Sequence, residues 1–138
     1  MSAIAVVDDD PGTLRVVSAT LATAGHVPLC YASFEEMCSV LYRFRPAAFI
    51  LDVQIPYIDG LAICRWVRGL PEYVRTPVLF LTSDTRPEAV AEALAAGGTD
   101  YLAKPIQPKL LLERLELQLC RRVARSPFLS VPSRRILL

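Results

Sequence analysis

Residues 47–52 read AAFILD, a stretch that is apolar up to its last residue, Asp52. A continuous apolar run of this length is typical of a central strand in a parallel sheet, because helices cover both faces of such a sheet. A carboxylate at the end of a buried strand is costly unless something pairs with it. The stretch therefore predicts an α/β fold with a polar group at the end of its most buried strand.

Four further apolar runs lie on either side of this stretch, and segments of helical period alternate with them. These runs are residues 3–7 (AIAVV), 26–32 (HVPLCYA), 76–82 (TPVLFLT) and 100–103 (DYLA). Strands that alternate with helices form parallel sheets, and right-handed crossovers place the helices on both faces. We expect a five-stranded, parallel, doubly wound (βα)5 sheet.

Helix start signals precede each helical segment. A capping residue or a proline stands at each expected start, and both favour a first helical turn. The last segment has four leucines at helical spacing, which we expect to face inward. The start signals are Asp10-Pro11, Ser33 to Glu36, Asp59-Gly60, Thr85 to Glu88 and Pro108, and the leucines are Leu111, Leu112, Leu115 and Leu119.

The bulk composition indicates one globular domain. The chain has 138 residues, of which 53% are hydrophobic and 21% charged, and this length suits a single core. Its four cysteines form no C-x-x-C pair, so reduced thiols in a cytoplasmic protein are expected. No run approaches the ~20 apolar residues that span a bilayer, and no signal peptide is evident.

Charge is distributed unevenly along the chain. The full chain carries +1, and five of its arginines follow residue 120, where no acid occurs, so residues 1–120 carry about −4. We expect a folded acidic module at residues 1–122 and a basic linker or tail at 123–138. The tail lacks a recognisable binding fold, so no nucleic-acid role is expected through this domain.

Chemically useful side chains stand at the expected carboxyl ends of the strands. Asp8 and Asp9 follow the first strand, Asp52 ends the third, and Thr82 and Lys104 end or follow the fourth and fifth. In doubly wound sheets, ligands gather beyond these ends. Two carboxylates ~4 Å apart repel by about 4 kcal/mol at an effective dielectric near 20. Such a cluster favours a hard dication, and Mg²⁺ suits oxygen ligands with retained water.

Four segments resemble, in order and spacing, the signature segments of response-regulator receiver domains, the CheY-like superfamily of two-component signal transduction. They are VVDDD (6–10), LDVQIPYIDG (51–60), VLFLTSD (78–84) and DYLAKP (100–105). The resemblance covers roughly residues 3–120. It implies a flavodoxin-like receiver fold and a module that accepts a phosphoryl group from a histidine kinase or a histidine phosphotransfer protein.

The resemblance also implies roles for individual residues. Asp52 corresponds to the phosphoacceptor and a Mg²⁺ ligand, Asp9 to a direct ligand, and Asp8 to a ligand through water. The backbone carbonyl of Gln54 would complete the metal shell. Lys104 would neutralise charge on the phosphoryl oxygens and on Asp52, and its bond to Pro105 is typically cis in this family.

A switch is implied as well. Thr82 resembles the hydroxyl that binds a phosphoryl oxygen, and Tyr101 the aromatic residue coupled to it. Their movement would change an output surface made by the fourth helix, fifth strand and fifth helix. Gln54 and Asp84, each two positions beyond Asp52 or Thr82, would tune dephosphorylation.

Ordinary interpretations apply to other residues. Asp10 is expected to cap a helix only. His26, the only histidine, has no acidic neighbour in sequence and is expected to be structural or merely exposed. Without a second histidine, the phosphodonor should be a separate protein or a missing domain. Arg65 and Arg68 are expected to lie on solvated faces.

Two other function classes stay open. A pseudo-receiver would act as an interaction or dimerisation module without phosphorylation, although the intact set of acids, threonine and lysine argues against it. A phosphatase with an aspartyl nucleophile is disfavoured because residues 52–54 lack its Asp-x-Asp pair. We expect no multiple-turnover enzyme, no membrane partner, and a downstream protein or a missing effector domain as output, with a homodimer left open.

Overall fold

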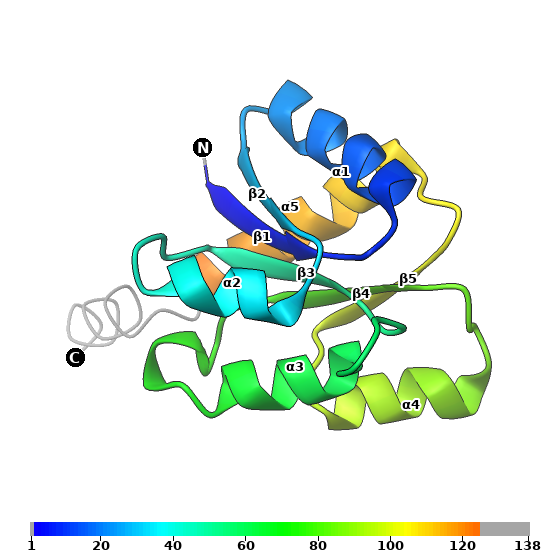
Figure 1. Ribbon diagram of the computed structural model, residues 1–138. Coiled ribbons are helices and arrows are strands. Elements are labelled where there is room, and N and C mark those ends of the chain that lie inside the picture. Colours follow the sequence, from blue (N-terminus) through cyan, green and yellow to red (C-terminus); the bar gives the residue numbers. More distant parts are fainter. Residues whose placement is uncertain (1, 125–138) are drawn as a thin grey trace, which may run out of the picture.

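The computed structural model describes residues 2–124 and contains the expected five strands and five α-helices in alternation (Figure 1). The strands are β1 (Ala3–Val7), β2 (Val27–Tyr31), β3 (Ala48–Asp52), β4 (Val78–Thr82) and β5 (Asp100–Ala103). The helices are α1 (Pro11–Thr23), α2 (Phe34–Leu41), α3 (Gly60–Arg68), α4 (Pro87–Ala95) and α5 (Pro108–Ala124), with a 3-10 turn η1 (Pro71–Tyr73).

The five strands form one parallel sheet in the order β2-β1-β3-β4-β5. The central position of β3 explains its apolar sequence, because all of its residues are buried. Val6 of β1 and Leu79 of β4 flank Ile50 in register. The predicted α/β fold class is confirmed.

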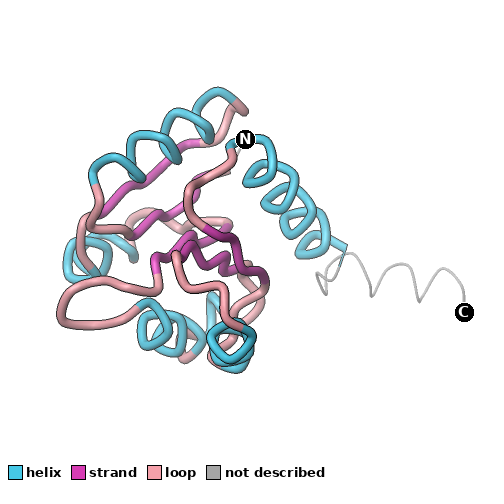
Figure 2. Tube along the Cα trace, turned by 90° about the vertical axis from the view of Figure 1, so that its right-hand side faces the viewer, coloured by secondary structure: helices cyan, strands magenta, loops and turns pink. Residues whose placement is uncertain are grey.

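Two layers of helices cover the sheet (Figure 2). One face packs against α2, α3 and α4, which contribute residues such as Met37, Ile63 and Ala93. The other face packs against α1 and α5, which contribute residues such as Leu21 and Leu115. All five helices run back from the carboxyl edge, so their last turns lie at the end of the molecule where the strands begin.

Three of the expected helix caps are present. Asp10 accepts hydrogen bonds from the backbone N–H groups of Gly12 and Thr13, Ser33 from that of Glu36, and Asp59 from that of Ala62. The prediction that Thr85 opens α4 was wrong. The N-cap residue is Arg86, which makes no side-chain cap because a guanidinium has no acceptor atom, and Pro87 is the first helical residue.

Two basic side chains have partners that the sequence did not reveal. Arg68 donates to the backbone carbonyls of Tyr73, Thr76 and Gly97, at 2.6–3.0 Å, so its prediction as a solvated residue was wrong. His26 is buried, and its Nε2 lies 2.6 Å from Glu116 Oε1 of α5. The structural interpretation of His26 therefore holds, and its partner is 90 positions away.

The last helix is amphipathic as expected. Leu111 and Leu115 are buried, and Leu112 and Leu119 are partly buried against the same cluster. No helix among residues 2–124 is both long and apolar enough to cross a membrane. Helix α5 is described through Ala124, so the rest of the predicted tail, from residue 125 on, lies outside the described residues.

Candidate functional site

Acidic and basic side chains from three strands meet at the carboxyl edge of the sheet. Asp8 follows β1, Asp52 is the last residue of β3, and Lys104 follows β5. The strand order reverses between β1 and β3, because the chain passes from β1 to β2 on one side and then to β3 on the other. Such a reversal is where ligands of doubly wound sheets bind.

Three carboxylates form the core of the site. Asp8, Asp9 and Asp52 each offer an oxygen, and these oxygens lie within 4.8 Å of one another. Asp8 and Asp52 are buried, while Asp9 is exposed. The cluster is thus closed from the side of the sheet and open to solvent at Asp9, which leaves an entry route for a cation.

Lys104 supplies the positive charge opposite these acids. Its Nζ lies 2.9 Å from Asp8 Oδ2 and 3.2 Å from Asp52 Oδ2. Burial would lower the pKa of Lys104, but its contacts with Asp8 and Asp52 outweigh burial and raise that pKa. The ammonium group therefore stays charged and neutralises one of the three acids.

The Asp52 carboxylate is held by one donor on each oxygen. Its Oδ1 accepts a hydrogen bond from the Gln54 backbone N–H at 3.1 Å, and its Oδ2 accepts one from Lys104. Burial raises the pKa of Asp52, the charge of Asp8 raises it further, and the two donors oppose the rise. The donor from Gln54 places that residue against Asp52, and a role for its carbonyl as a ligand stays a prediction.

The donor set fits a hard divalent cation. Asp8 Oδ2 is buried and lies in an ion pair with Lys104. Among the described residues, however, no donor makes a hydrogen bond of good geometry to this oxygen. Three clustered carboxylates with a single lysine keep an excess negative charge, which Mg²⁺ with retained water would offset. The three carboxylates therefore form an acidic cluster that could bind a divalent metal ion.

The loop after Asp52 curls back onto the acceptor's own backbone. Gly60 donates from its N–H to the Val53 carbonyl, and a Cβ at Gly60 would lie 2.1 Å from the Asp52 carbonyl oxygen. Tyr57 in this loop is fully exposed and has a φ angle of 72°. The sequence interpretation of Asp59-Gly60 as a turn and cap was right, but it missed this close approach, for which an aspartate-glycine pair gives only a weak signal.

Thr82 and Tyr101 meet at the backbone of Asp84. Thr82 is buried, and its Oγ1 accepts a hydrogen bond from the Asp84 N–H at 3.0 Å. The Tyr101 hydroxyl donates to the Asp84 carbonyl. The two residues expected to act as a switch are thus linked through one peptide segment, although the switch itself stays a prediction.

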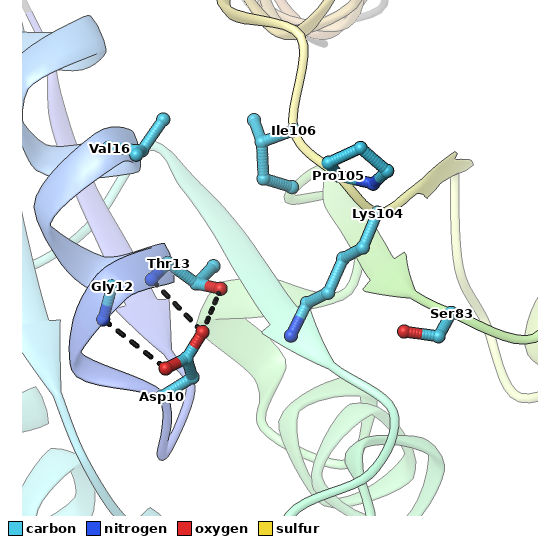
Figure 3. A pocket seen from close by; sticks show the side chains of 8 residues that line it. All are labelled: Asp10, Gly12, Thr13, Val16, Ser83, Lys104, Pro105 and Ile106. Atoms are coloured by element: carbon cyan, nitrogen blue, oxygen red, sulfur yellow. Dashed lines mark hydrogen bonds between the residues drawn. The ribbon is translucent and has the colours of Figure 1, made fainter.

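An open cleft of about 550 Å³ is lined by Lys104 and by residues of α1 (Figure 3). Lys104 extends from the segment after β5 toward the side of α1, whose residues Gly12, Thr13 and Val16 form the facing wall (Figure 3). Thr13 was not singled out from the sequence, although it follows the capping Asp10 and donates to it. The Lys104–Pro105 bond is cis, as the resemblance implies.

A doubly wound sheet with a carboxylate pocket at its switch point and a lysine opposite defines the class of CheY-like flavodoxin folds. The model of the response regulator receiver domain matches residues 4–116. The chain therefore belongs to the response regulator receiver domain family.

Individual relatives agree with this assignment. Protein RcaC of Microchaete diplosiphon is 36% identical over 86% of this chain, and transcriptional regulatory protein AfsQ1 of Streptomyces coelicolor is 31% identical over 88%. The crystal structure of Vibrio cholerae chemotaxis protein CheY4 matches with a TM-score of 0.80 at 34% identity, over 84% of this chain and 97% of that one. This chain spans 18% of RcaC and 52% of AfsQ1.

Proposed function

We propose that this chain is the phosphoacceptor module of a two-component system and takes a phosphoryl group onto Asp52. The donor would be a histidine kinase or a histidine phosphotransfer protein. The observation that carries the proposal is a buried carboxylate at the end of the central strand, with two more acids within 4.8 Å and Lys104 at 3.2 Å. An arrangement that serves folding alone would not gather this much like charge.

The geometry suits Asp52 as a carboxylate nucleophile. An oxygen of Asp52 would attack phosphorus in line, the bond from phosphorus to the donor's histidine nitrogen would break, and the electron pair would remain on the imidazole. Lys104 Nζ, which lies 2.9 Å from Asp8 Oδ2, would donate to a phosphoryl oxygen. Mg²⁺, held by Asp8, Asp9, Asp52 and the Gln54 carbonyl, would neutralise charge on the transferring group.

Reversal requires water to reach the phosphorylated Asp52. We expect one phosphoryl group per chain and slow hydrolysis, which is not the behaviour of a multiple-turnover enzyme. Gln54 is exposed beside Asp52, and the Asp84 carboxylate is paired with Arg86 at 2.8 Å. These two side chains are therefore the ones expected to set the lifetime of the phosphorylated state.

The output would run through Thr82 and Tyr101. A phosphoryl oxygen would accept a hydrogen bond from the Thr82 hydroxyl, whose oxygen also accepts from the Asp84 N–H. This bond would draw Thr82 and the linked Asp84 segment toward the site. Because Tyr101 binds the carbonyl of the same residue, a shift of this segment would change the surface of α4, β5 and α5. In the cytoplasm, a downstream protein or an effector domain would bind that surface, or two copies of the chain would form a homodimer through it.

The test is the intact mass of the protein after incubation with acetyl phosphate, with and without Mg²⁺. We expect one added phosphoryl group that requires Mg²⁺ and is absent from Asp52→Asn. Asp59→Asn is the matched control, because Asp59 is an exposed helix cap outside the acid cluster. No adduct on the native chain, together with no binding of beryllofluoride, would instead support an interaction module that works without phosphorylation.

A further inference from the structure

A second surface lies at the opposite end of the molecule from Asp52. A groove of about 200 Å³ opens between the last turns of α2 and α3 and the turn η1. Its lining is mostly apolar and includes Leu41, Tyr42, Trp66, Leu70 and Tyr73. Helices α2 and α3 run back from the carboxyl edge of the sheet (Figure 1), so this groove belongs to the edge where the strands begin.

Two edge-to-face ring contacts fix the shape of the groove. The Phe34 and Trp66 rings lie 5.1 Å apart at 87°, and the Phe49 and Tyr73 rings lie 5.2 Å apart at 85°. Such contacts favour one ring orientation. The walls are therefore formed before any ligand arrives, which lowers the entropy lost on binding.

Exposed aromatic and basic side chains alternate beside the groove. Tyr42, Arg43, Phe44 and Arg45 are all exposed, and Tyr42 retains 79% of its accessible surface. Exposed residues within 42–45, 65–66 and 72–74, here called the Tyr42–Trp66 surface, include three arginines and one acid, Glu72. Neither Arg43 nor Arg45 forms an ion pair with another residue among those described.

This composition resembles that of protein-binding hot spots. Tyr, Trp and Arg dominate binding energy at protein interfaces, and a small pocket at the centre accepts one buried anchor. The excess of arginine selects a negatively charged partner. The volume of the groove suits a single large apolar side chain and is below the ~300 Å³ at which small-molecule sites begin.

We propose that the Tyr42–Trp66 surface binds an acidic segment of a partner protein, which inserts one large apolar side chain into the groove. Arg43 and Arg45 pair with acids on either side of the anchor. This site is separate from the phosphoacceptor site, because Asp52 lies at the carboxyl edge of β3. Partners could therefore engage it without covering Asp52.

The test uses the full chain and a pool of short synthetic peptides in which Asp and Glu flank one Leu, Ile, Phe or Trp. Because Trp66 is the only tryptophan and lines the groove, its fluorescence reports binding for the Leu, Ile and Phe peptides. We expect a saturable change. The Arg43→Glu/Arg45→Glu variant should bind at least about tenfold more weakly. Replacing the anchor with Ser should have the same effect.

The matched control is Arg15→Glu/Lys109→Glu, which makes the same change in net charge at exposed positions on α1 and α5. This control should bind the peptides as tightly as the native chain does. Both double variants should keep the native circular dichroism spectrum and accept a phosphoryl group at Asp52. No saturable binding, or equal loss in both double variants, would overturn the proposal. Tighter binding of a single-stranded oligonucleotide than of the peptides would also overturn it. A fluorescence change that depends only on protein concentration would do the same, because it would report association with a second copy of the chain.

Discussion

Lys104 has two opposite electrostatic effects at the site. Its ammonium group stabilises the acids by contacting Asp8 and Asp52, yet it also repels a cation that would bind them. We predict that Lys104→Met binds Mg²⁺ about tenfold more tightly, because removal of a nearby unit charge is worth on the order of 1 kcal/mol after solvent screening. Calorimetric titration measures this, with the exposed Lys109→Met as control. Weaker binding by Lys104→Met would show that the lysine orders the site instead.

Asp84 gives a prediction about pH. The Arg86 side chain and backbone N–H lower the pKa of Asp84 to about 2. Because this pKa is lower in the folded state, ionised Asp84 stabilises the fold at pH values above its unfolded pKa of 3.8. That stabilisation is lost as the pH falls toward 2. The native chain should therefore be slightly more stable than Asp84→Asn at pH 7, and urea midpoints of the two should converge below pH 3.8. A constant gap between them would contradict this origin.

Single residues were predictable where strand ends gave their position. Asp8, Asp9, Asp52 and Lys104 could be placed together from the sequence, because parallel strands bring their carboxyl ends to one edge. Arg68 could not, because its partners are backbone carbonyls, which carry no sequence signal.

Among the elements, helix α3 depends on the size of its first residue. A Cβ at Gly60 would lie 2.1 Å from the Asp52 carbonyl oxygen, whereas one at Gly12 of α1 would meet nothing closer than 3.6 Å. Gly60→Ala should therefore destabilise the fold by about 1–3 kcal/mol or more and slow phosphorylation. Gly12→Ala should stabilise it by up to about 1 kcal/mol. Urea unfolding measures the change in unfolding free energy for each variant. If both replacements changed it in the same direction, the close approach at Gly60 would be refuted.

The segment between α3 and β4 depends on Arg68. This side chain bonds carbonyls of η1, of the residues before β4 and of the turn after α4, so it ties three connections together. We expect Arg68→Ala to lose about 2–4 kcal/mol of unfolding free energy, because three carbonyls lose a charged donor. Arg68→Lys should recover only part of this, because an ammonium lacks the planar fork. The exposed Arg65→Ala should change stability by less than about 0.5 kcal/mol.

The residue at which a helix begins was predictable from the sequence in some cases and not in others. Caps with a side-chain acceptor, such as Asp10 and Ser33, were predictable because their chemistry is local. Helix α4 begins one residue later than its apparent capping signature, because Pro87 sets the first turn and competes with Thr85 as a start signal.

For the molecule as a whole, the burial of the strands matches their inner or edge positions in the sheet. The two strands with five buried residues, β3 and β4, lie inside the sheet, and the more exposed β2 lies at its edge. Pairing across long sequence distances was harder to foresee. His26 with Glu116 and Asp100 with Arg114 both anchor α5, and neither pair has a local signature.

The four thiols offer a test of how the whole molecule opens. Cys120 is exposed on α5, whereas Cys64 lies on the buried face of α3, and burial raises the pKa of Cys64. An aromatic disulfide reagent should label Cys120 at once, because only an accessible thiolate reacts. Cys64 should react at least about a thousandfold more slowly. The reagent can reach it only after the structure around it unfolds, which costs about 5 kcal/mol or more. Cys120→Ser should remove the fast phase alone. Fast labelling of Cys64 in that variant would mean that α3 separates from the sheet without global unfolding, and the groove beside Trp66 would then be only transiently formed.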